Sequence, residues 1–233
     1  MTPDRGRVAF LRRALKAWGR KHVRRFPWRK THDPYRVLIA ELMLRRTRPA
    51  QVLPIYRTFI VRYRSPRKLA TATDEDLSRL LAPLGLHWRA RNVMAIARAV
   101  AHLTPAAYRN GAMLKRLPGV GEYVSSAVQI MVFNRPACAI DTNVIRVLGR
   151  YWGLPVHPEA RRQRAFKEVA RRCVPRRDAK LYTLALLDLG AAICTPREPR
   201  CRECPLHVHC RFAQDISSPI PPRAGQPRKV RVA

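Results

Sequence analysis

Four cysteines near the carboxyl end of the chain have the spacing of a metal site. Cys194, Cys201, Cys204 and Cys210 form a C-x6-C-x2-C-x5-C array. Four thiolates in so short a segment can enclose one metal centre, either a [4Fe–4S] cluster or a tetrahedral zinc ion. Structural zinc sites usually use two close cysteine pairs. This array contains only one such pair, so the spacing favours the cluster.

Arginines stand between these cysteines, at Arg197, Arg200 and Arg202. A loop that is folded by a metal and carries several guanidinium groups makes a rigid clamp for phosphate. His207 and His209 could serve as zinc ligands, but we expect them to be ordinary loop residues.

A second motif, Leu117-Pro118-Gly119-Val120-Gly121, lies between two expected helices. Two glycines let the backbone turn tightly and approach a ligand closely. The N–H groups here and at the start of the next helix can bind a phosphate oxygen without regard to base sequence. A plain turn between helices would explain the same residues. Together with the cysteine loop and the charge of the chain, the motif favours phosphate binding.

Two carboxylates stand in unusual places. Asp141 begins an expected helix, and capping that helix would hold its carboxylate fixed and ionised. Glu41 lies inside the apolar run 38–44. An acid in such a run is costly to bury unless it is paired or protonated. Glu41 is therefore either half of an i,i+4 pair with Arg45 on an exposed face, or a carboxyl of raised pKa that donates a proton.

The composition points to a polyanionic partner. Of 233 residues, 47 are Lys or Arg and 15 are Asp or Glu, which gives a net charge of +32 and excludes an ordinary neutral enzyme. Hydrophobic residues make up 47%, enough for a real core. The amino end lacks an apolar signal segment, and the longest apolar stretch, 181–193, is too short to span a bilayer. We expect a cytoplasmic protein that does not contact membranes.

The spacing of apolar residues predicts an all-α fold, because no alternation is long enough for a sheet. Asp33-Pro34 and Thr73 have the residue types that start helices. Residues 214–233 form a basic, Pro-rich tail that we expect to be disordered. The expected helices cover residues 7–21, 35–46, 50–63, 73–81, 88–103, 112–117, 122–133, 141–152, 158–173 and 179–193.

Taken together, these features resemble the helix-hairpin-helix DNA glycosylases of the endonuclease III superfamily that carry an iron–sulfur loop. The resemblance covers about residues 26–210, most of the chain, and its order and spacing are highly specific. It rests on Phe26-Pro27-Trp28-Arg29, Asp33-Pro34-Tyr35, Glu41-Leu42-Met43-Leu44-Arg45-Arg46-Thr47, the segment 117–121, Asp141, Leu189-Gly190-Ala191 and the four cysteines.

The resemblance implies two domains with the substrate DNA in the cleft between them. A six-helix barrel domain with the helix-hairpin-helix would cover residues 22–134, and residues 1–21 and 135–213 would form the iron–sulfur cluster domain. The partner would be double-stranded DNA with a mismatched or damaged base, bound by a monomer. The catalytic aspartate of the family matches Asp141, and its DNA-binding hairpin matches Leu117, Gly119, Val120 and Gly121.

The residue at position 123 indicates which reaction is carried out. Bifunctional members of the superfamily carry a lysine two residues after the second hairpin glycine and use it as a Schiff-base nucleophile. Here that position is Tyr123, which cannot form an imine. The resemblance therefore implies a monofunctional enzyme that removes a base and leaves the sugar-phosphate strand intact.

Two monofunctional groups fit the sequence. MutY-type adenine glycosylases share the Phe-Pro-Trp start and the acidic positions, but they carry a Gln-Gln-Thr segment and a further carboxyl-terminal domain, whereas this chain has Arg45-Arg46-Thr47 and stops soon after Cys210. Mig-type T/G-mismatch glycosylases resemble it in these respects, so we favour removal of thymine or uracil opposite guanine. The alternatives are an adenine glycosylase and a non-catalytic DNA-binding protein on the same scaffold.

The implied reaction assigns a role to each candidate residue. The target base must leave the stack, and Arg46 would act either as a wedge in the vacated space or as a plain phosphate contact. Breaking the glycosidic bond builds positive charge on the sugar, which an ionised Asp141 would stabilise. A protonated Glu41 or the hydroxyl of Tyr123 would assist the departing base.

Overall fold

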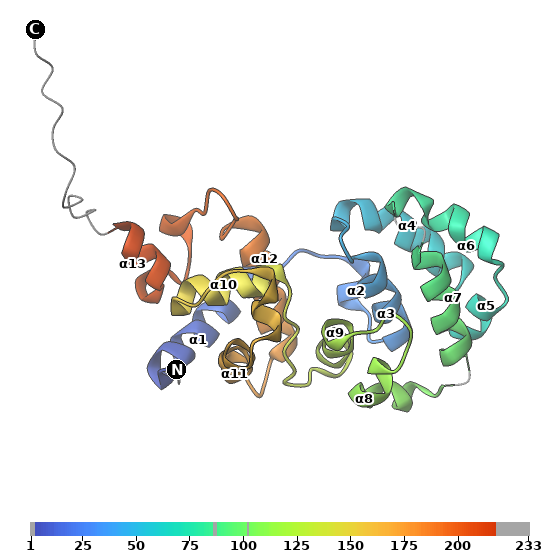
Figure 1. Ribbon diagram of the computed structural model, residues 1–233, viewed down its shortest axis with the longest axis horizontal. Coiled ribbons are helices and arrows are strands. Elements are labelled where there is room, and N and C mark those ends of the chain that lie inside the picture. Colours follow the sequence, from blue (N-terminus) through green and yellow to red (C-terminus); the bar gives the residue numbers. More distant parts are fainter. Residues whose placement is uncertain (1–2, 86–87, 102, 218–233) are drawn as a thin grey trace, which may run out of the picture.

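The computed structural model describes residues 3–85, 88–101 and 103–217, which are helical and contain no strand. The predicted all-α fold is confirmed for these residues. The helices form two lobes that lie side by side (Figure 1). The first lobe consists of α2 to α9, and the second consists of α1 together with α10 to α13.

The first lobe follows the chain without interruption. Its elements are α2 (Pro27–Lys30), α3 (Pro34–Met43), α4 (Pro49–Arg62), α5 (Pro66–Ala70), α6 (Asp74–Leu81), the 3-10 helix η1 (Ala82–Leu84), α7 (Trp88–Val100), η2 (Pro105–Arg109), α8 (Gly111–Lys115) and α9 (Glu122–Phe133).

The second lobe combines the two ends of the chain. Its elements are α1 (Arg5–His22), α10 (Thr142–Trp152), η3 (Pro158–Arg162), α11 (Arg164–Cys173), α12 (Ala179–Ala192), η4 (Cys201–Glu203), η5 (His207–His209) and α13 (Arg211–Ser217).

Each lobe has its own hydrophobic core. Leu38 and Phe59 are fully buried in the first, while Leu15 and Tyr151 are fully buried in the second. Leu184 is an exception, because it belongs to α12 but packs into the core of the first lobe. Burial of apolar surface therefore stabilises two separate units as well as the contact between them.

Helix α1 joins the second lobe by packing along α12. Gly19 makes this close approach feasible, since a Cβ at this position would lie 2.7 Å from the Cβ of Ala185. The chain crosses between the lobes over residues 23–26 and again over residues 134–141. Asn134 begins the second crossing in a left-handed conformation, with φ 50°, and its side chain accepts a 2.8 Å hydrogen bond from the backbone N–H of Lys180.

We expect Gly19→Ala to destabilise the protein. Overpacking of this kind costs about 1–3 kcal/mol, whereas alanine improves helix propensity by only about 1 kcal/mol. Thermal unfolding should therefore show a lower Tm for Gly19→Ala. Gly121→Ala is the control, because a Cβ there would meet no atom within 4 Å. Equal Tm values for the two variants would contradict the predicted clash.

Helix capping follows the sequence closely. The carboxylate of Asp33 accepts hydrogen bonds from the backbone N–H groups of Tyr35 and Arg36 at 2.9 and 3.4 Å, and Pro34 occupies the first turn. The hydroxyl of Thr73 accepts a 3.1 Å bond from the N–H of Asp76. Both predicted helix starts are confirmed.

Several boundaries differ from the prediction. The short helices α2 and α5 were not expected, and the expected helix 158–173 is divided into η3 and α11 at Gln163, which has an extended ψ of 127°. Helix α3 ends at Met43, three residues before the predicted end. Residues 214–217 belong to α13, so this part of the expected tail is helical. The rest of the tail, 218–233, lies outside the described residues.

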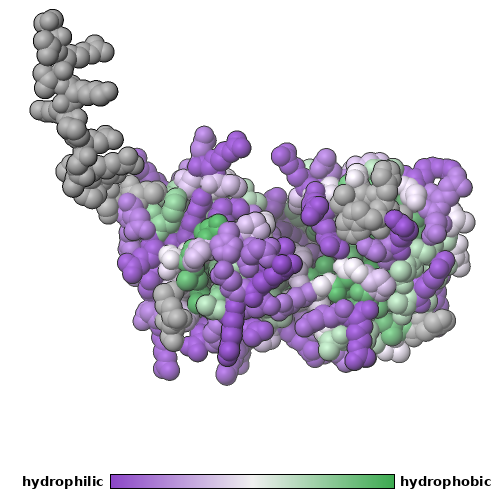
Figure 2. Space-filling model, viewed as in Figure 1, coloured by the Kyte–Doolittle hydropathy of each residue, from purple (hydrophilic) through white to green (hydrophobic). Residues whose placement is uncertain are grey.

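The surface agrees with the charge of the chain. Figure 2 shows hydrophilic side chains over most of the visible face and a hollow between the two lobes. Within the described part of the chain, no helix has both the length and the apolar character needed to cross a bilayer.

Candidate active site and nucleic-acid interface

The carboxylate of Asp141 caps helix α10 at the junction of the lobes. Its Oδ1 accepts a 2.7 Å hydrogen bond from the N–H of Val144, and its Oδ2 accepts a 2.9 Å bond from the side-chain amide of Asn143. The side chain is only partly exposed. Burial raises the pKa of Asp141 above its ordinary value, although both hydrogen bonds act in the opposite direction. Capping fixes the carboxylate as predicted, but burial opposes its ionisation.

Glu41 is buried, with 6% of its surface exposed. This excludes an ion pair on an exposed face and leaves the alternative of a carboxyl with a raised pKa. The pKa of Glu41 is raised to about 7, chiefly by burial and to a smaller degree by the nearby carboxylate of Asp141, while the charge of Arg29 and a hydrogen bond with Tyr123 act in the opposite direction. One oxygen of Glu41, Oε2, has no hydrogen-bond partner among the described residues.

Tyr123 completes the group from α9. Its hydroxyl forms a hydrogen bond with the Glu41 side chain. Burial raises the pKa of Tyr123 well above its ordinary value, and the carboxylates of Glu41 and Asp141 raise it further. The hydroxyl is therefore neutral, and it donates the hydrogen bond to the Glu41 side chain. The three predicted catalytic residues, from α3, α9 and the start of α10, thus lie within electrostatic reach of one another.

Asn143 and Arg146 support Asp141 and were missed in the sequence. The guanidinium of Arg146 donates to Asn143 Oδ1 at 2.8 Å, to the carbonyl of Gly190 at 2.7 Å and to the carbonyl of Cys194 at 2.6 Å. Gly190 allows this packing, because a Cβ there would lie 2.7 Å from the Cβ of Asn143. The position of Asp141 is thus linked to the start of the cysteine loop.

A buried ion-pair group beside Glu41 was also missed. Asp188 on α12 is 1% exposed. It accepts hydrogen bonds from Arg24, which precedes α2, and from Arg29, which lies in α2. An acid inside the apolar run 181–193 was the available signal, since buried acids need partners. Burial would raise the pKa of Asp188, but the hydrogen bonds from Arg29 and Arg24 hold it below its ordinary value.

The raised pKa of Glu41 predicts that the free energy of unfolding depends on pH. A carboxyl whose pKa is raised by folding stabilises the native state at low pH and loses that contribution as the pH rises through about 7. Between pH 5 and pH 8 the wild type should lose on the order of 2–3 kcal/mol from this group. Urea unfolding at both pH values should show a smaller loss for Glu41→Gln, and equal losses would contradict the raised pKa.

The hairpin at 117–121 exposes backbone groups that could bind a phosphate. Gly119 has φ 71°, and the exposed glycines Gly119 and Gly121 flank Val120, whose side chain is buried, as is that of Leu117. Only the backbone of Leu117 and Val120 can therefore reach a phosphate. The carbonyl of Gly119 accepts a 3.1 Å hydrogen bond from Arg45, which ties the hairpin to the end of α3.

The segment Arg45-Arg46-Thr47 follows α3 directly. Arg45 and Arg46 are exposed, and Thr47 is partly exposed. Arg46 has φ 57°, a left-handed conformation that costs a non-glycine residue free energy and is typical of functional loops. The segment therefore holds Arg46 in a conformation that an unconstrained loop would avoid.

The cysteine loop brings all four predicted ligands to one cavity. Cys194, Cys201, Cys204 and Cys210 line it together with Arg150, which donates a 3.4 Å hydrogen bond to Cys194 Sγ. Among the described residues, no three His, Cys, Asp or Glu side chains are placed to hold a single metal ion. The four cysteines thus share the lining of one cavity.

The loop arginines differ in what they contact. Arg197 and Arg202 are exposed, as the clamp requires. Arg200 instead braces the loop, since it donates to the carbonyl of Ala192 at 2.8 Å and forms a 2.9 Å ion pair with Glu203.

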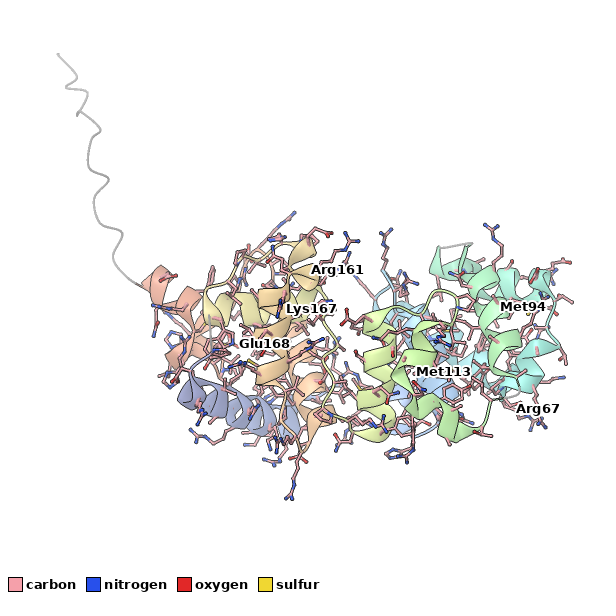
Figure 3. The ribbon with its side chains drawn as sticks, turned by 60° about the horizontal axis from the view of Figure 1, so that its bottom comes forward. Arg67, Met94, Met113, Arg161, Lys167 and Glu168 are labelled. Atoms are coloured by element: carbon pink, nitrogen blue, oxygen red, sulfur yellow. The ribbon has the colours of Figure 1, made fainter. Side chains whose placement is uncertain are left out.

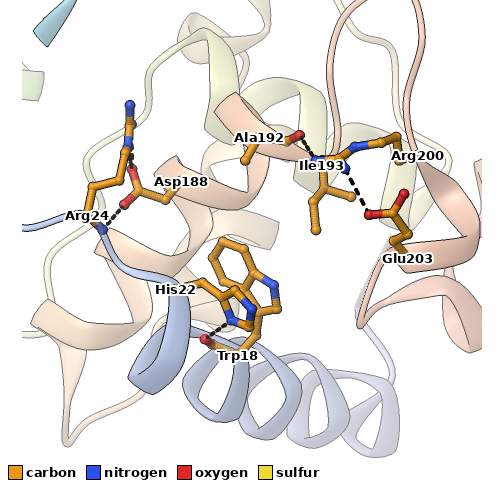
Figure 4. A pocket seen from close by; sticks show the side chains of 8 residues that line it. All are labelled: Trp18, His22, Arg24, Asp188, Ala192, Ile193, Arg200 and Glu203. Atoms are coloured by element: carbon orange, nitrogen blue, oxygen red, sulfur yellow. Dashed lines mark hydrogen bonds and ion pairs between the residues drawn. The ribbon is translucent and has the colours of Figure 1, made fainter. Parts of the chain in front are cut away.

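A cavity of about 460 Å³ lies beside the loop and is shown in Figure 4. Its walls include Trp18 stacked on His22, with Arg24 and Asp188 at one side. None of the three predicted catalytic residues lines it. The ion pair of Asp188 with Arg29 connects this cavity to the surroundings of Glu41.

A second contact joins the lobes at the hairpin. Lys167 on α11 forms a 2.7 Å ion pair with Glu122, the first residue of α9. Figure 3 shows Lys167 on the second lobe, close to Arg161 and Glu168. Among the described residues, this ion pair and those of Asp188 therefore both connect the lobes.

Known proteins with similar sequence and structure are DNA glycosylases. A thymine-DNA glycosylase of Aeropyrum pernix is 36% identical over 219 residues, which cover 90% of this chain and 96% of that protein. An adenine DNA glycosylase of Mycobacterium tuberculosis is 34% identical over 225 residues, covering 91% and 71% respectively. The solved structure of a thermostable thymine-DNA glycosylase matches with a TM-score of 0.83 and 30% identity, covering 90% of this chain and 98% of the other.

A family profile gives the same assignment. Residues 39–172, more than half of the chain, match the profile described as HhH-GPD superfamily base excision DNA repair protein. The matched segment includes Glu41, the hairpin, Tyr123 and Asp141, and the resemblance seen in the sequence is confirmed. The chain belongs to the HhH-GPD superfamily of base excision DNA repair proteins.

Proposed function

We propose that this chain is a monofunctional DNA glycosylase that hydrolyses the N-glycosidic bond of thymine or uracil opposite guanine. The observation that carries the proposal is the meeting of Glu41, Tyr123 and Asp141 where the two lobes join. A buried carboxyl with a pKa near 7 and a second, fixed carboxylate are the pair that acid-assisted cleavage of a glycosidic bond requires. The similarity to thymine-DNA glycosylases supports the choice of base.

The proposed mechanism divides the work between the two carboxyl groups. Asp141, held by Val144 and Asn143, stabilises the positive charge that builds on the sugar and orients the attacking water. Protonated Glu41 assists the departing base, and the hydroxyl of Tyr123 keeps Glu41 in place. No step requires an imine, since position 123 has no amine.

DNA would be held at three places around this group. The backbone of the hairpin 117–121 and the exposed Arg197 and Arg202 would bind phosphates. The strained loop at Arg46 would enter the space left by the flipped base.

We further propose that the protein acts as a monomer with domains at residues 22–134 and at 1–21 with 135–213. The two separate hydrophobic cores support this division.

We also propose that the four cysteines hold a [4Fe–4S] cluster. The four thiolates line one cavity and would supply the donor set that such a cluster needs. The array has a single close cysteine pair, Cys201 and Cys204, which favours this donor set over tetrahedral zinc. When bound, the cluster supplies folding free energy to the arginine loop.

The test is a panel of duplexes with T·G, U·G, A·G and A opposite 8-oxoguanine, incubated with excess enzyme. We expect release of thymine and uracil, and strand breaks only after alkali treatment. Release of adenine alone would instead establish the second candidate, which the similarity to adenine DNA glycosylases favours. Tight, salt-sensitive binding without release of any base would establish a non-catalytic DNA-binding protein.

A further inference from the structure

Asp188 is the most heavily hydrogen-bonded carboxylate in the described part of the chain. It accepts from the backbone N–H of Arg24 at 2.9 Å and from the guanidinium of Arg24 at 2.9 and 2.6 Å. It also accepts from both terminal nitrogens of Arg29, at 2.7 and 3.1 Å. Asp188 belongs to the second lobe and Arg29 to the first, so the pair crosses the junction at which the catalytic group lies.

Arg29 bonds to the carboxylate of Asp188 and acts electrostatically on a second carboxyl group, that of Glu41. Its side chain is 11% exposed, and both of its terminal nitrogens are directed to Asp188. Glu41 is close enough to be affected by the charge of Arg29, yet its Oε2 has no hydrogen-bond partner among the described residues. A buried guanidinium that lost Asp188 would therefore have a second buried acceptor within electrostatic reach.

We propose that Asp188 is a positioning residue that holds the guanidinium of Arg29 away from Glu41 and so leaves Glu41 able to carry the proton given to the departing base. The inference rests on the proposed function. It assigns to Asp188 a role in proton transfer without contact to the substrate. Charge-assisted bidentate bonds of this kind are strong and directional, which suits them to fixing the position of a cation.

The groups around Glu41 determine the sign of the effect. They are Arg29 on α2, Tyr123 on α9 and Asp141 at the start of α10. If Asp188 loses its charge, Arg29 turns toward Glu41 and stabilises the ionised carboxylate, so the pKa of Glu41 falls. A reaction that needs protonated Glu41 then loses rate at a lower pH than in the wild type.

The experiment measures single-turnover excision between pH 5 and pH 9 on a T·G duplex. Asp188→Asn keeps the shape of the side chain and removes its charge. We expect the midpoint of its rate loss at high pH to fall by at least one pH unit, while DNA affinity stays within twofold of the wild type. Asp178→Asn is the matched control. Asp178 directly precedes α12 and also pairs with a cation, Lys16, but its side chain is half exposed.

Two further variants distinguish positioning from general damage. The double variant Asp188→Asn with Arg29→Met lacks the guanidinium that would move toward Glu41. The pH midpoint of its rate loss should therefore return to the wild-type value or above. Arg24→Met leaves Asp188 with one arginine, so Arg29 is held more firmly and the midpoint should rise. The Arg24 side chain is 44% exposed, so this variant tests the inference even if Asp188→Asn fails to fold. A double variant that keeps the lowered midpoint would overturn the proposal.

A second readout does not depend on catalysis. The chain has only 15 Asp and Glu residues, so a carbon-13 NMR titration of labelled glutamate can follow the Glu41 carboxyl, assigned with Glu41→Gln. We expect a lower pKa of Glu41 in Asp188→Asn, and an unchanged or higher value would refute the inference. If the wild type releases no base from any duplex, the proposed function fails, but the titration still decides the role of Asp188.

Discussion

Asp141→Asn should lower the single-turnover rate of base excision by about 10³-fold, the range expected when a group that stabilises transition-state charge is lost. Asparagine can still accept the hydrogen bond from the N–H of Val144, so helix α10 keeps its cap. What disappears is the negative charge facing the sugar. Because the change removes an anion, affinity for DNA should not fall. Excision with excess enzyme and fluorescence anisotropy measure the two effects separately.

The control for this variant is Asp33→Asn. Asp33 caps α3 in the same way, through the N–H groups of Tyr35 and Arg36, but it does not belong to the catalytic group. We expect near wild-type excision from Asp33→Asn. Full activity in Asp141→Asn would remove the basis of the proposed mechanism, because that mechanism assigns the stabilisation of the charged sugar to Asp141.

Cys204→Ala should have the second largest effect. With one of four ligands gone, we expect the purified protein to lose its iron and the loop 194–210 to lose its fixed structure. Arg197 and Arg202 would no longer be positioned, so the slope of log affinity against log salt should fall by about 2. Excision should also slow, since the carbonyl of Cys194 holds Arg146 and Arg146 holds Asn143.

Iron analysis and anisotropy over a series of salt concentrations test this prediction. Cys138→Ala provides the control, because Cys138 lies outside the array and does not line its cavity. It should retain full iron and unchanged DNA affinity. Iron at the wild-type level in Cys204→Ala, or zinc in place of iron in the wild type, would show that the proposed cluster assignment is wrong.

Most of the helices could be predicted because their signals are local. The caps at Asp33 and Thr73 and the apolar spacing within each helix act over a few residues. The short helices α2 and α5 have only 4 and 5 residues, too few for a spacing pattern to be visible. The local signals were their proline starts, Pro27 and Pro66, and the serine at position 65, which caps α5.

The candidate site divides in the same way. Asp141 and Glu41 could be selected from their own surroundings in the sequence, one at a helix start and one in an apolar run. The partners that set their properties could not, since Arg29 meets Asp188 across 159 residues and Arg146 meets Cys194 across 48. Such pairs depend on how the lobes pack, which no local pattern specifies. The resemblance to a family suggested the proposed catalytic role of Asp141, and the structure showed the groups that hold its side chain.

The position of α1 has a consequence for synthesis on the ribosome. Helix α1 is made first, but its packing partner α12 is separated from it by more than 150 residues, including the entire first lobe. The first lobe can therefore form its core before α12 is made. During that time Leu11 and Leu15 of the amphipathic helix α1 remain exposed to solvent. A nascent chain released near residue 140 should show a protected first lobe and a protease-sensitive amino-terminal helix.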